Sequence, residues 1–473
     1  MSAGTGARLR EIESAILSRR PEHAIEPSLD RIRALVNLLG DPQRAYPVIH
    51  VTGTNGKTST SRMAETLLRT RGLRTGLFTS PHLTSMRERI CVDGEPLPAE
   101  RFIEAYDEIE PYLQLVDARQ PVPLSFFEVL TGMAFAVFAD APVDVAVIEV
   151  GMGGTWDNTN VADGAVAVIT PVAIDHARYL GTTVEQIAAD KAGIIKPGAV
   201  AVLSQQPVGA AEALMQRAAQ VGSSVAREGL EFGVLSREPA VGGQQLAIRG
   251  LLGDYDGLFL PLFGAHQAGN AATALAAVEA FAGAAPDPAE DSAAGGQRLG
   301  PLDSDLVREA FAAMSSPGRL EIVRRSPVVI LDAAHNPAGM AATVAAMTES
   351  FSFAELIAIL GVSEDKDVPG ILDQMEPLVS ELVVTQSSSP RAMPAAKLAE
   401  LARAVLGPDR VREAARLDDA IEIAVALADE AASGAGRDPA LAGGAGVLIT
   451  GSVITAGDAR LLLAGRDGDP GRP

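Results

Sequence analysis

The sequence predicts an α/β protein of two domains, a large parallel-sheet domain followed by a smaller Rossmann-like α/β domain. Strand-like apolar runs alternate with helical segments from about residue 48 onward, as in parallel sheets covered by helices. The 473 residues suggest two or three domains, at about 100–200 residues for each. Because 47% of residues are apolar but only 4% are aromatic, the cores must consist mainly of Ala, Val, Leu and Ile.

The expected elements of the first domain follow in order. Residues 8–40 look helical, with interruptions at Pro21 and Pro27. The expected strands are 48–52, 74–79, 143–150, 165–170 and 199–204. Further helices are expected directly after the first strand and at 99–118 and 125–139. The run 143–150 is the clearest buried strand, since it is largely apolar and lies between Pro142 and Gly151.

A second α/β pattern begins near Arg319. Its expected strands are 328–332, 356–360, 382–385 and 447–450. We therefore expect one domain at 1–316 and another at 317–465. Residues 283–301 are rich in Gly, Pro, Ala and acidic residues, which predicts a mobile surface insertion, and 466–473 read as a disordered tail.

Charge and cysteine content limit the classes of partner. The net charge of −21 should repel nucleic acid and anionic membranes, so we expect neither as a partner. Cys91 is the only cysteine, which rules out an intrachain disulfide and fits a reducing compartment. The N-terminus lacks the apolar core of a signal peptide, and the longest apolar runs have strand length. We therefore expect a cytoplasmic protein, acting as a monomer.

The stretch His-Val-Thr-Gly-Thr-Asn-Gly-Lys-Thr-Ser-Thr at 50–60 predicts a triphosphate site. A glycine-bearing turn between strand and helix directs backbone N–H groups, and the positive end of the helix dipole, at one spot. Lys57 would reach the β- and γ-phosphates, and the Thr58 hydroxyl would bind Mg²⁺. Val51 replaces the first glycine of the general G-x-x-x-x-G-K-[ST] pattern. The alternative is a glycine-rich turn with an incidental lysine.

Polar residues follow two further strands at the edge where ligands bind in open α/β sheets. Glu149 ends the strand 143–150 and suits a metal-holding acid, although a solvated strand-end acid is the alternative. Trp156, in the glycine-rich loop that follows, either walls a pocket for a flat ring or fills a hydrophobic gap. His176 follows Asp175 after the strand 165–170, and we favour a metal-ligand role for it over a structural one. Lys191 by itself reads as an ordinary helix-surface lysine.

Arg319 and Asp332 flank the expected domain boundary. Arg319 follows Pro317-Gly318, and Asp332 ends the first strand of the second domain. An arginine at this place can bind a phosphate through paired hydrogen bonds. The alternative is a structural ion pair between domains.

Together, these motifs resemble the folate-tailoring ligases of the Mur ligase superfamily, the folylpolyglutamate synthases and their bifunctional dihydrofolate synthase forms. The matching segments occur in the family's order over about residues 50–452. They are Thr-Gly-Thr-Asn-Gly-Lys-Thr (52–58), Thr-Ser-Pro-His-Leu (79–83), Glu-Arg-Ile (88–90), Phe-Glu (127–128), Glu-Val-Gly-Met-Gly-Gly (149–154), Asp-Asn-Thr-Asn (157–160), Asp-His (175–176) with Leu-Gly (180–181), Lys-Ala-Gly-Ile-Ile-Lys (191–196), His-Gln-x-x-Asn (266–270), Pro-Gly-Arg (317–319), Asp-x-Ala-His-Asn (332–336), Gly361 with Asp-Lys-Asp (365–367) and Gly-Ser (451–452).

The resemblance implies roles for particular residues. Those implied to bind ATP are Asn55, Gly56, Lys57, Thr58, Asn270, Arg319 and Asp332. The first Mg²⁺ would bind Thr58, Ser80 and Glu149, and the second would bind His176 and Lys191 carried as a carbamate. The pterin-bearing substrate would contact residues 26–29, Ser125, Phe126, Phe127, Glu128, Trp156, Asp157 and Asn158. His335 would lie near the phosphates or the incoming glutamate, and Lys57, His176, Lys191 and His335 would form the catalytic set.

The sequence departs from the family at three places. Ala333 stands where a glycine commonly follows the aspartate, Glu-Pro-Ser-Leu at 26–29 replaces an Asp-Leu-Gly-Leu type segment, and Val161-Ala162 lacks the family's proline.

The implied reaction is ATP-dependent joining of L-glutamate to a folate carboxylate, or to dihydropteroate, through an acyl phosphate. A peptidoglycan-type Mur ligase is the first alternative, and it would require an additional N-terminal domain where only about 45 residues precede the phosphate loop. A nucleotide switch that forms no amide is the second.

Overall fold

The computed structural model describes residues 3–21, 26–284, 302–433 and 444–466. It contains two compact units, each with its own sheet and cores. The first comprises Met1–Arg237, Gln245–Leu260 and Gln267–Met314, and the second comprises Glu238–Gln244, Pro261–His266 and Ser315–Pro473. Glu238–Gln244 and Pro261–His266, which the sequence placed in the first domain, thus belong to the second unit. The insertion expected at 283–301 lies outside the described residues except for Gly283 and Ala284, and the expected tail does so beyond Arg466.

The sheet of the first unit has eight strands in the order β4-β3-β2-β5-β1-β6-β7-β8. The strands from β2 to β8 in this order run parallel. At the other edge, β3 is antiparallel to both of its neighbours, β2 and β4. Their bounds are β1 Val48–Thr52, β2 Thr75–Phe78, β3 Ile90–Val92, β4 Glu95–Pro96, β5 Val145–Glu149, β6 Gly164–Ile169, β7 Val200–Leu203 and β8 Ser224–Arg227. The prediction of a parallel sheet is confirmed, with an antiparallel edge that was not anticipated.

The register of this sheet brings several strand ends to one edge. Val51 pairs with Glu149, Thr52 pairs with Ile169, and Phe78 of β2 pairs with Ile148. Because the carboxyl ends of parallel strands share an edge, the loops after β1, β2, β5 and β6 begin side by side.

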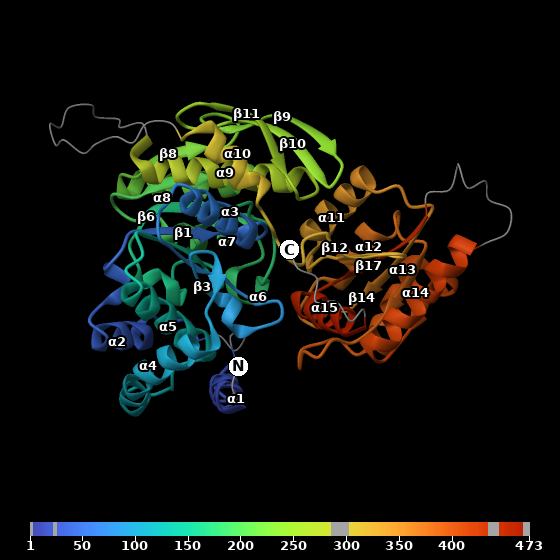
Figure 1. Cartoon of the computed structure of the whole chain (residues 1–473), viewed down its shortest axis with the longest axis horizontal. Coiled ribbons are helices and arrows are strands. Elements are labelled where there is room, and N and C mark those ends of the chain that lie inside the picture. The colour runs from blue at the N-terminus through green and yellow to red at the C-terminus, as the bar shows by residue number, and fades with distance from the viewer. Residues whose placement is uncertain (1–2, 22–25, 285–301, 434–443, 467–473) are drawn as a thin grey trace. The chain divides into compact units, whose positions relative to one another are not determined.

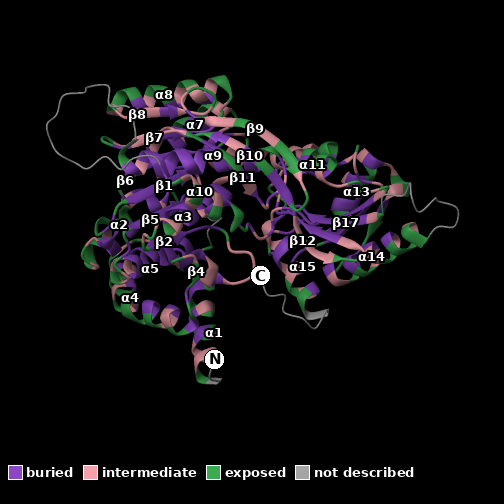
Figure 2. Cartoon of the chain, turned by 45° about the horizontal axis from the view of Figure 1, so that its top comes forward, coloured by how far each residue is buried: buried purple, intermediate pink, exposed green. Residues whose placement is uncertain are grey.

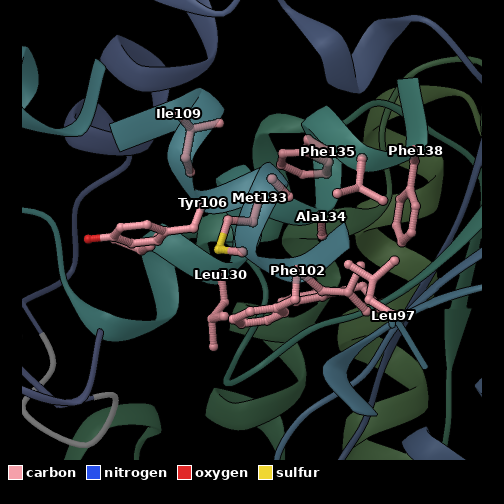
Figure 3. Close-up of a cluster of buried hydrophobic side chains, with 14 of the residues drawn as sticks. Leu97, Phe102, Tyr106, Ile109, Leu130, Met133, Ala134, Phe135 and Phe138 are labelled. Carbon is pink, nitrogen blue, oxygen red and sulfur yellow. The ribbon is translucent and has the colours of Figure 1, made fainter. Parts of the chain in front are cut away.

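The helices of the first unit pack on this sheet and on one another (Figure 1). Their bounds are α1 Ala3–Leu17, α2 Asp30–Leu38, α3 Lys57–Thr70, α4 Ala99–Arg119, α5 Phe126–Asp140, α6 Ala177–Leu180, α7 Val184–Lys191, α8 Val208–Val221, α9 Ala265–Glu279 and α10 Ser304–Ala312. Helix α5 packs against α2 and α4. Figure 3 shows the core between α4 and α5, where Phe102, Tyr106 and Ile109 meet side chains from 130–138.

A three-stranded sheet, in the order β11-β10-β9, was not predicted. It consists of β9 Gly233–Ala240, β10 Gly243–Arg249 and β11 Asp254–Leu260. No residue of β9 is fully buried, so its sequence lacks the apolar alternation by which half-buried strands are identified.

The second unit has a six-stranded sheet in the order β12-β13-β17-β14-β15-β16, parallel except for β12. Its strands are β12 Glu321–Arg325, β13 Val328–Leu331, β14 Glu355–Leu360, β15 Glu381–Val384, β16 Val411–Glu413 and β17 Ala445–Thr450. Its helices are α11 Pro337–Ser350, α12 Val368–Met375, α13 Ala395–Leu406, α14 Leu417–Ser433 and α15 Val453–Arg466. Arg466 therefore belongs to a helix and not to the expected tail.

Burial follows the expected layers in both units. The central strands are buried on both faces, whereas many helices have one buried and one exposed face (Figure 2). The α/β class with a second Rossmann-like unit is thereby confirmed. Among the described residues, no helix combines the length and apolarity needed to cross a bilayer.

Candidate active site

The phosphate loop lies between β1 and α3 and depends on two glycines. Gly53 has φ +148°, and a Cβ there would lie 1.8 Å from Thr170 Oγ1. Gly56 has φ +87°, and a Cβ there would lie 2.4 Å from Asn270 Oδ1. Backbone N–H groups of Thr54 and Asn55 donate to the Pro171 carbonyl, at 3.0 and 3.4 Å. The loop after β6 and the start of α9 therefore fix the loop conformation, and they place Asn270 directly against Gly56.

Lys57 and Thr58 begin helix α3 and face different partners. Lys57 Nζ donates to the carbonyls of Gly53 and Thr54, both at 3.2 Å, so the lysine folds back over its own loop. Thr58 Oγ1 donates to Glu149 Oε1 at 2.9 Å, and the Ser80 N–H donates to Glu149 Oε2 at 3.2 Å. One carboxylate from the end of β5 thus joins the residues that follow β1 and β2.

The Thr58–Glu149–Ser80 group fits a magnesium ion chemically. A buried carboxylate beside hydroxyl groups supplies the hard oxygen ligands that Mg²⁺ prefers. Within the part of the chain that the structure describes, no three His, Cys, Asp or Glu side chains gather into a metal cluster. A site here would therefore depend on hydroxyl groups, phosphate oxygens or a modified lysine as additional ligands.

Lys191 is a buried lysine at the end of α7, contrary to its surface appearance in the sequence alone. It is 3% exposed, and its Nζ donates to the Gly53 carbonyl at 2.7 Å. Burial, together with the charge of Lys57, lowers the pKa of Lys191 to about 7, although Asp190 and Asp175 act in the opposite direction. At neutral pH, a substantial fraction of this amine is thus uncharged and nucleophilic.

Asp175 and His176 lie in the loop after β6. His176 adopts φ +52° at the start of the short helix α6, and its backbone N–H donates to Asp175 Oδ1 at 2.8 Å. The imidazole Nε2 lies 3.9 Å from Asp175 Oδ2. Asp175 is close enough to affect the Lys191 pKa, so this loop belongs to the surroundings of the lysine.

The loop 151–160 is ordered by Asp157. Its Oδ2 accepts from Met152 N at 3.0 Å, and its Oδ1 accepts from both the N–H and the hydroxyl of Thr159, at 2.9 and 2.5 Å. Burial raises the Asp157 pKa, against these hydrogen bonds. Trp156 is partly buried against an apolar cluster around Val150 and Leu180. Asn158 begins the short 3₁₀ helix Asn158–Val161 and is half-buried.

The start of α5 gathers the other predicted substrate residues. Ser125 and Glu128 form a capping box, in which Glu128 N donates to Ser125 Oγ at 3.3 Å and Ser125 N donates to Glu128 Oε2 at 2.7 Å. Phe126 lies under the guanidinium of Arg89, at 4.9 Å. Phe127 packs on Phe78, with ring centroids 5.7 Å apart.

Arg31 is a partner of this group that the sequence reading missed. Its Nε donates to both carboxylate oxygens of Glu128, at 2.9 and 3.1 Å. The two residues are 97 positions apart, and no spacing rule relates them. The one usable signal was an arginine on the apolar face of a helix, between Leu29 and Ile32.

In the second unit, the buried carboxylate of Asp332 accepts hydrogen bonds that fix the loops around it. Its Oδ1 accepts from Ala334 N at 2.9 Å and from Thr343 Oγ1 at 2.8 Å, and its Oδ2 accepts from Leu320 N at 3.1 Å. Leu320 has φ +45°, an unusual conformation for a leucine. Asp332 thereby fixes the backbone beside Arg319.

Arg319 and His335 lie on either side of this aspartate in the sequence. The Arg319 guanidinium is half-buried and donates to the Gly318 carbonyl at 3.5 Å. His335 Nδ1 is 3.0 Å from the Ala333 carbonyl, and Asn336 caps α11 by accepting from Gly339 N at 2.8 Å. Ala333, at the family's glycine position, is buried and donates to Gly318 O at 2.9 Å.

The predicted site residues thus form two groups, one in each unit. Hydrogen bonds and close approaches link the phosphate loop to Asn270, Glu149 and Lys191 in the first unit. The start of α5 and the loop 151–160 meet where the Phe127 ring would lie 2.7 Å from a Cβ at Gly151. Arg319, Asp332 and His335 form the second group, at the carboxyl end of β13.

Comparison with known proteins identifies both units. Residues 128–278 match the Mur ligase middle domain, and residues 318–452 match the Mur ligase, glutamate ligase domain. A dihydrofolate synthase/folylpolyglutamate synthase of Mycobacterium tuberculosis is 50% identical over 478 residues, covering 98% of this chain and 95% of its own length. A folylpolyglutamate synthase of Lacticaseibacillus casei is 34% identical and covers 77% of this chain and 83% of its own.

Solved structures agree with the sequence relatives. The structure of M. tuberculosis folylpolyglutamate synthase complexed with ADP superimposes with a TM-score of 0.90 at 49% identity, covering 97% of this chain and 99% of the other. E. coli FolC in complex with DHPP and ADP gives a TM-score of 0.80 at 28% identity, covering 97% and 98%. The chain therefore belongs to the dihydrofolate synthase/folylpolyglutamate synthase family of Mur ligases, as its motifs predicted.

Proposed function

We propose that this protein is an ATP-dependent ligase that joins L-glutamate to the carboxylate of a reduced folate, and that it also accepts dihydropteroate. The observation that carries the proposal is the convergence of the phosphate loop, Glu149 and Lys191 in a chain 50% identical to a dihydrofolate synthase/folylpolyglutamate synthase. That relative favours a folate substrate over a peptidoglycan precursor, and a ligase over a nucleotide switch.

The reaction requires phosphoryl transfer followed by amide formation. The substrate carboxylate attacks the γ-phosphate of ATP and forms an acyl phosphate, which the amine of glutamate then attacks with release of phosphate. We assign Asn55, Gly56, Lys57 and Thr58 to binding of the nucleotide phosphates. The Lys57 ammonium group would then leave the carbonyls of Gly53 and Thr54 and contact the negative charge that develops on the transferred phosphoryl group.

Two magnesium sites are part of the proposal. Thr58, Ser80 and Glu149 would hold the first ion, and His176 with a carbamylated Lys191 would hold the second. Bound Mg²⁺ would neutralise charge on the phosphates. Carbamylation requires an uncharged amine, and the lowered pKa of the buried Lys191 supplies one.

The remaining assignments concern the substrates. We assign Ser125, Phe126, Phe127, Glu128, Trp156, Asp157 and Asn158 to the pterin-bearing substrate. Asn270 would contact ATP from the first unit, and Arg319 and Asp332 would do so from the second. His335 would lie near the phosphates or the incoming glutamate. We assign ATP binding to a domain at 1–316 and glutamate ligation to one at 317–465, in a cytoplasmic monomer.

Phosphate release, measured with ATP, glutamate and either tetrahydrofolate or dihydropteroate, tests the function. We expect turnover that requires both the pterin substrate and glutamate, and that Lys57→Ala abolishes while the protein stays folded. Hydrolysis of ATP that ignores both co-substrates would instead support the nucleotide switch. Turnover with one pterin substrate alone would restrict the protein to one of the two activities.

A further inference from the structure

We propose that Arg31 is a positioning residue for the pterin-bearing substrate, because it holds the start of α5 through Glu128 and the chain at Glu26 through direct contacts. The inference rests on the proposed function, because the start of α5 matters for catalysis only if it contacts that substrate. It adds a residue from α2 for which neither the motifs nor the family resemblance suggested a role.

The contact between Arg31 and Glu128 is buried and bifurcated, since one nitrogen of the arginine donates to both carboxylate oxygens. Arg31 is 6% exposed and Glu128 is fully buried, and the Arg31 Nε lies within 3.1 Å of both carboxylate oxygens. The same carboxylate accepts from Ser125 N at 2.7 Å as part of the capping box. Glu128 therefore links α2 to the first turn of α5, and a shift of the arginine must move that turn or break both contacts.

The packing beside this pair leaves little freedom between the two helices. Leu35 lies one turn after Arg31, and Gly132 lies one turn after Glu128. A Cβ on Gly132 would lie 2.5 Å from Leu35 Cδ2, so α2 and α5 are in close contact there. The ion pair and this contact occupy one ridge, so they define both the distance between the helices and their register.

Arg31 also holds the chain that precedes α2. Its NH2 donates to the Glu26 carbonyl at 3.2 Å, and its NH1 lies 3.6 Å from the Glu26 carboxylate. Arg20 pairs with the same carboxylate at 2.5 Å, and its carbonyl accepts from Phe126 N at 2.9 Å. The chain at Glu26 and the start of α5, which the family resemblance places near the pterin substrate, thus share one buried arginine.

Positioning explains this arrangement better than stability alone. A buried ion pair can often be replaced by apolar residues without loss of stability, because desolvation offsets the attraction. The geometry is fixed here because the planar guanidinium donates through Nε to Glu128 and through a terminal nitrogen to the Glu26 carbonyl, and few orientations satisfy both. Here the fixed element is the backbone that carries Phe126 and Phe127.

The test compares three variants with the wild type. Arg31→Met combined with Glu128→Gln removes both charges but keeps the capping box, in which glutamine can replace glutamate, so no uncompensated charge remains buried. Arg31→Lys keeps the charge without the planar guanidinium and its several donors. Arg33→Met, at an exposed position of the same helix, is the matched control. The measurements are KM for the pterin substrate, KM for ATP, melting temperature and amide hydrogen exchange over 125–131.

We expect the double variant to raise KM for the pterin substrate about tenfold and to speed exchange at the start of α5, with KM for ATP unchanged. Arg31→Lys should fall between it and the wild type, and Arg33→Met should match the wild type. Equal increases in both KM values, or exchange unchanged over 125–131, would overturn the proposal. Wild-type protein without pterin-dependent turnover would refute the proposed function instead, and the exchange measurement would still decide whether Arg31 holds α5.

Discussion

Thr58 donates its hydroxyl hydrogen to Glu149 at 2.9 Å, across 91 positions of sequence. Thr58 begins the helix after β1, and Glu149 ends β5, the neighbouring strand. The parallel pairing of Val51 with Glu149 fixes this approach. The threonine and the acid therefore reach one point because of strand register, and that point is where we place a magnesium ion.

The first prediction concerns this pair. Thr58→Val should lower kcat/KM at least about 100-fold, because the hydroxyl ligand is lost where charge develops. Thr58→Ser keeps the hydroxyl and should retain most activity, while both variants melt within a few degrees of the wild type. If Thr58→Val is as active as Thr58→Ser, the hydroxyl has no part in the reaction. Steady-state kinetics over a range of Mg²⁺ concentrations provides the measurement.

Lys191 provides the second prediction. If its carbamate supplies anionic oxygens, Lys191→Ala should lose activity and regain part of it when a short carboxylate such as acetate is added, since removal of the side chain leaves space for a small anion. Lys57→Ala should gain nothing from acetate, because a cation is missing there. Phosphate release with and without acetate distinguishes the two. Absence of rescue in Lys191→Ala would argue against the carbamate.

Gly53 is the subject of the third prediction. Gly53→Ala would place a Cβ 1.8 Å from Thr170 Oγ1 and 2.8 Å from its carbonyl, so the phosphate loop must move. We expect ADP affinity, measured by calorimetry, to fall at least about tenfold. Gly253→Ala is the control, because nothing lies within 4 Å of a Cβ there. Unaltered affinity in Gly53→Ala would mean that the loop adjusts without consequence for phosphate binding.

The fourth prediction is a pH dependence of stability that arises from His50. This fully buried histidine lies in β1, with Nε2 2.8 Å from Thr159 Oγ1, and its Nδ1 has no hydrogen-bond partner among the described residues. Burial lowers the His50 pKa to about 3. The unfolded chain, with a histidine pKa of about 6.5, binds the proton first as the pH falls, so the free energy of unfolding decreases below pH 6.5.

From these two values, His50 should cost about 2 kcal/mol of stability between pH 8 and pH 5. Urea unfolding at both pH values measures the loss. His50→Gln, which cannot be protonated in this range, should show a pH dependence smaller by that amount, even if it is less stable overall. Equal pH dependence in the two proteins would contradict the prediction.

The fifth prediction separates two roles of Asp332. Its three hydrogen bonds fix Leu320 and the loop after β13. Asp332→Asn keeps the size but disturbs at least one bond, so we expect a loss of about 1–3 kcal/mol in unfolding free energy. If Asp332 served only to contact ATP, the substitution would instead weaken nucleotide binding and leave the unfolding free energy unchanged. Denaturant unfolding and ADP calorimetry on the same variant distinguish these outcomes.

Much of the fold could be predicted because its strands are unusually apolar. The strand 48–52 agrees with β1 at both ends, and 143–150 contains all of β5. The sheet β9–β11 was missed, because β9 has no fully buried residue and its sequence mixes charge with Pro239. The edge strands β3 and β4 were missed as well, since strands of two or three residues are too short to show an alternation of apolar and polar side chains.

The sequence by itself determined the α/β class, the order of the strands along the chain and the phosphate loop, because apolar periodicity and the glycine-lysine spacing are local properties. Tertiary structure alone decided that Lys191 is buried against Gly53 and that Glu128 is paired with Arg31. It also decided that Asp157 and Asp332 accept hydrogen bonds from the backbone of nearby loops. Each of these depends on which segments pack together, and desolvation then determines the chemistry of the side chain. A lysine that reads as a surface residue becomes, through burial, an amine that is partly uncharged at neutral pH.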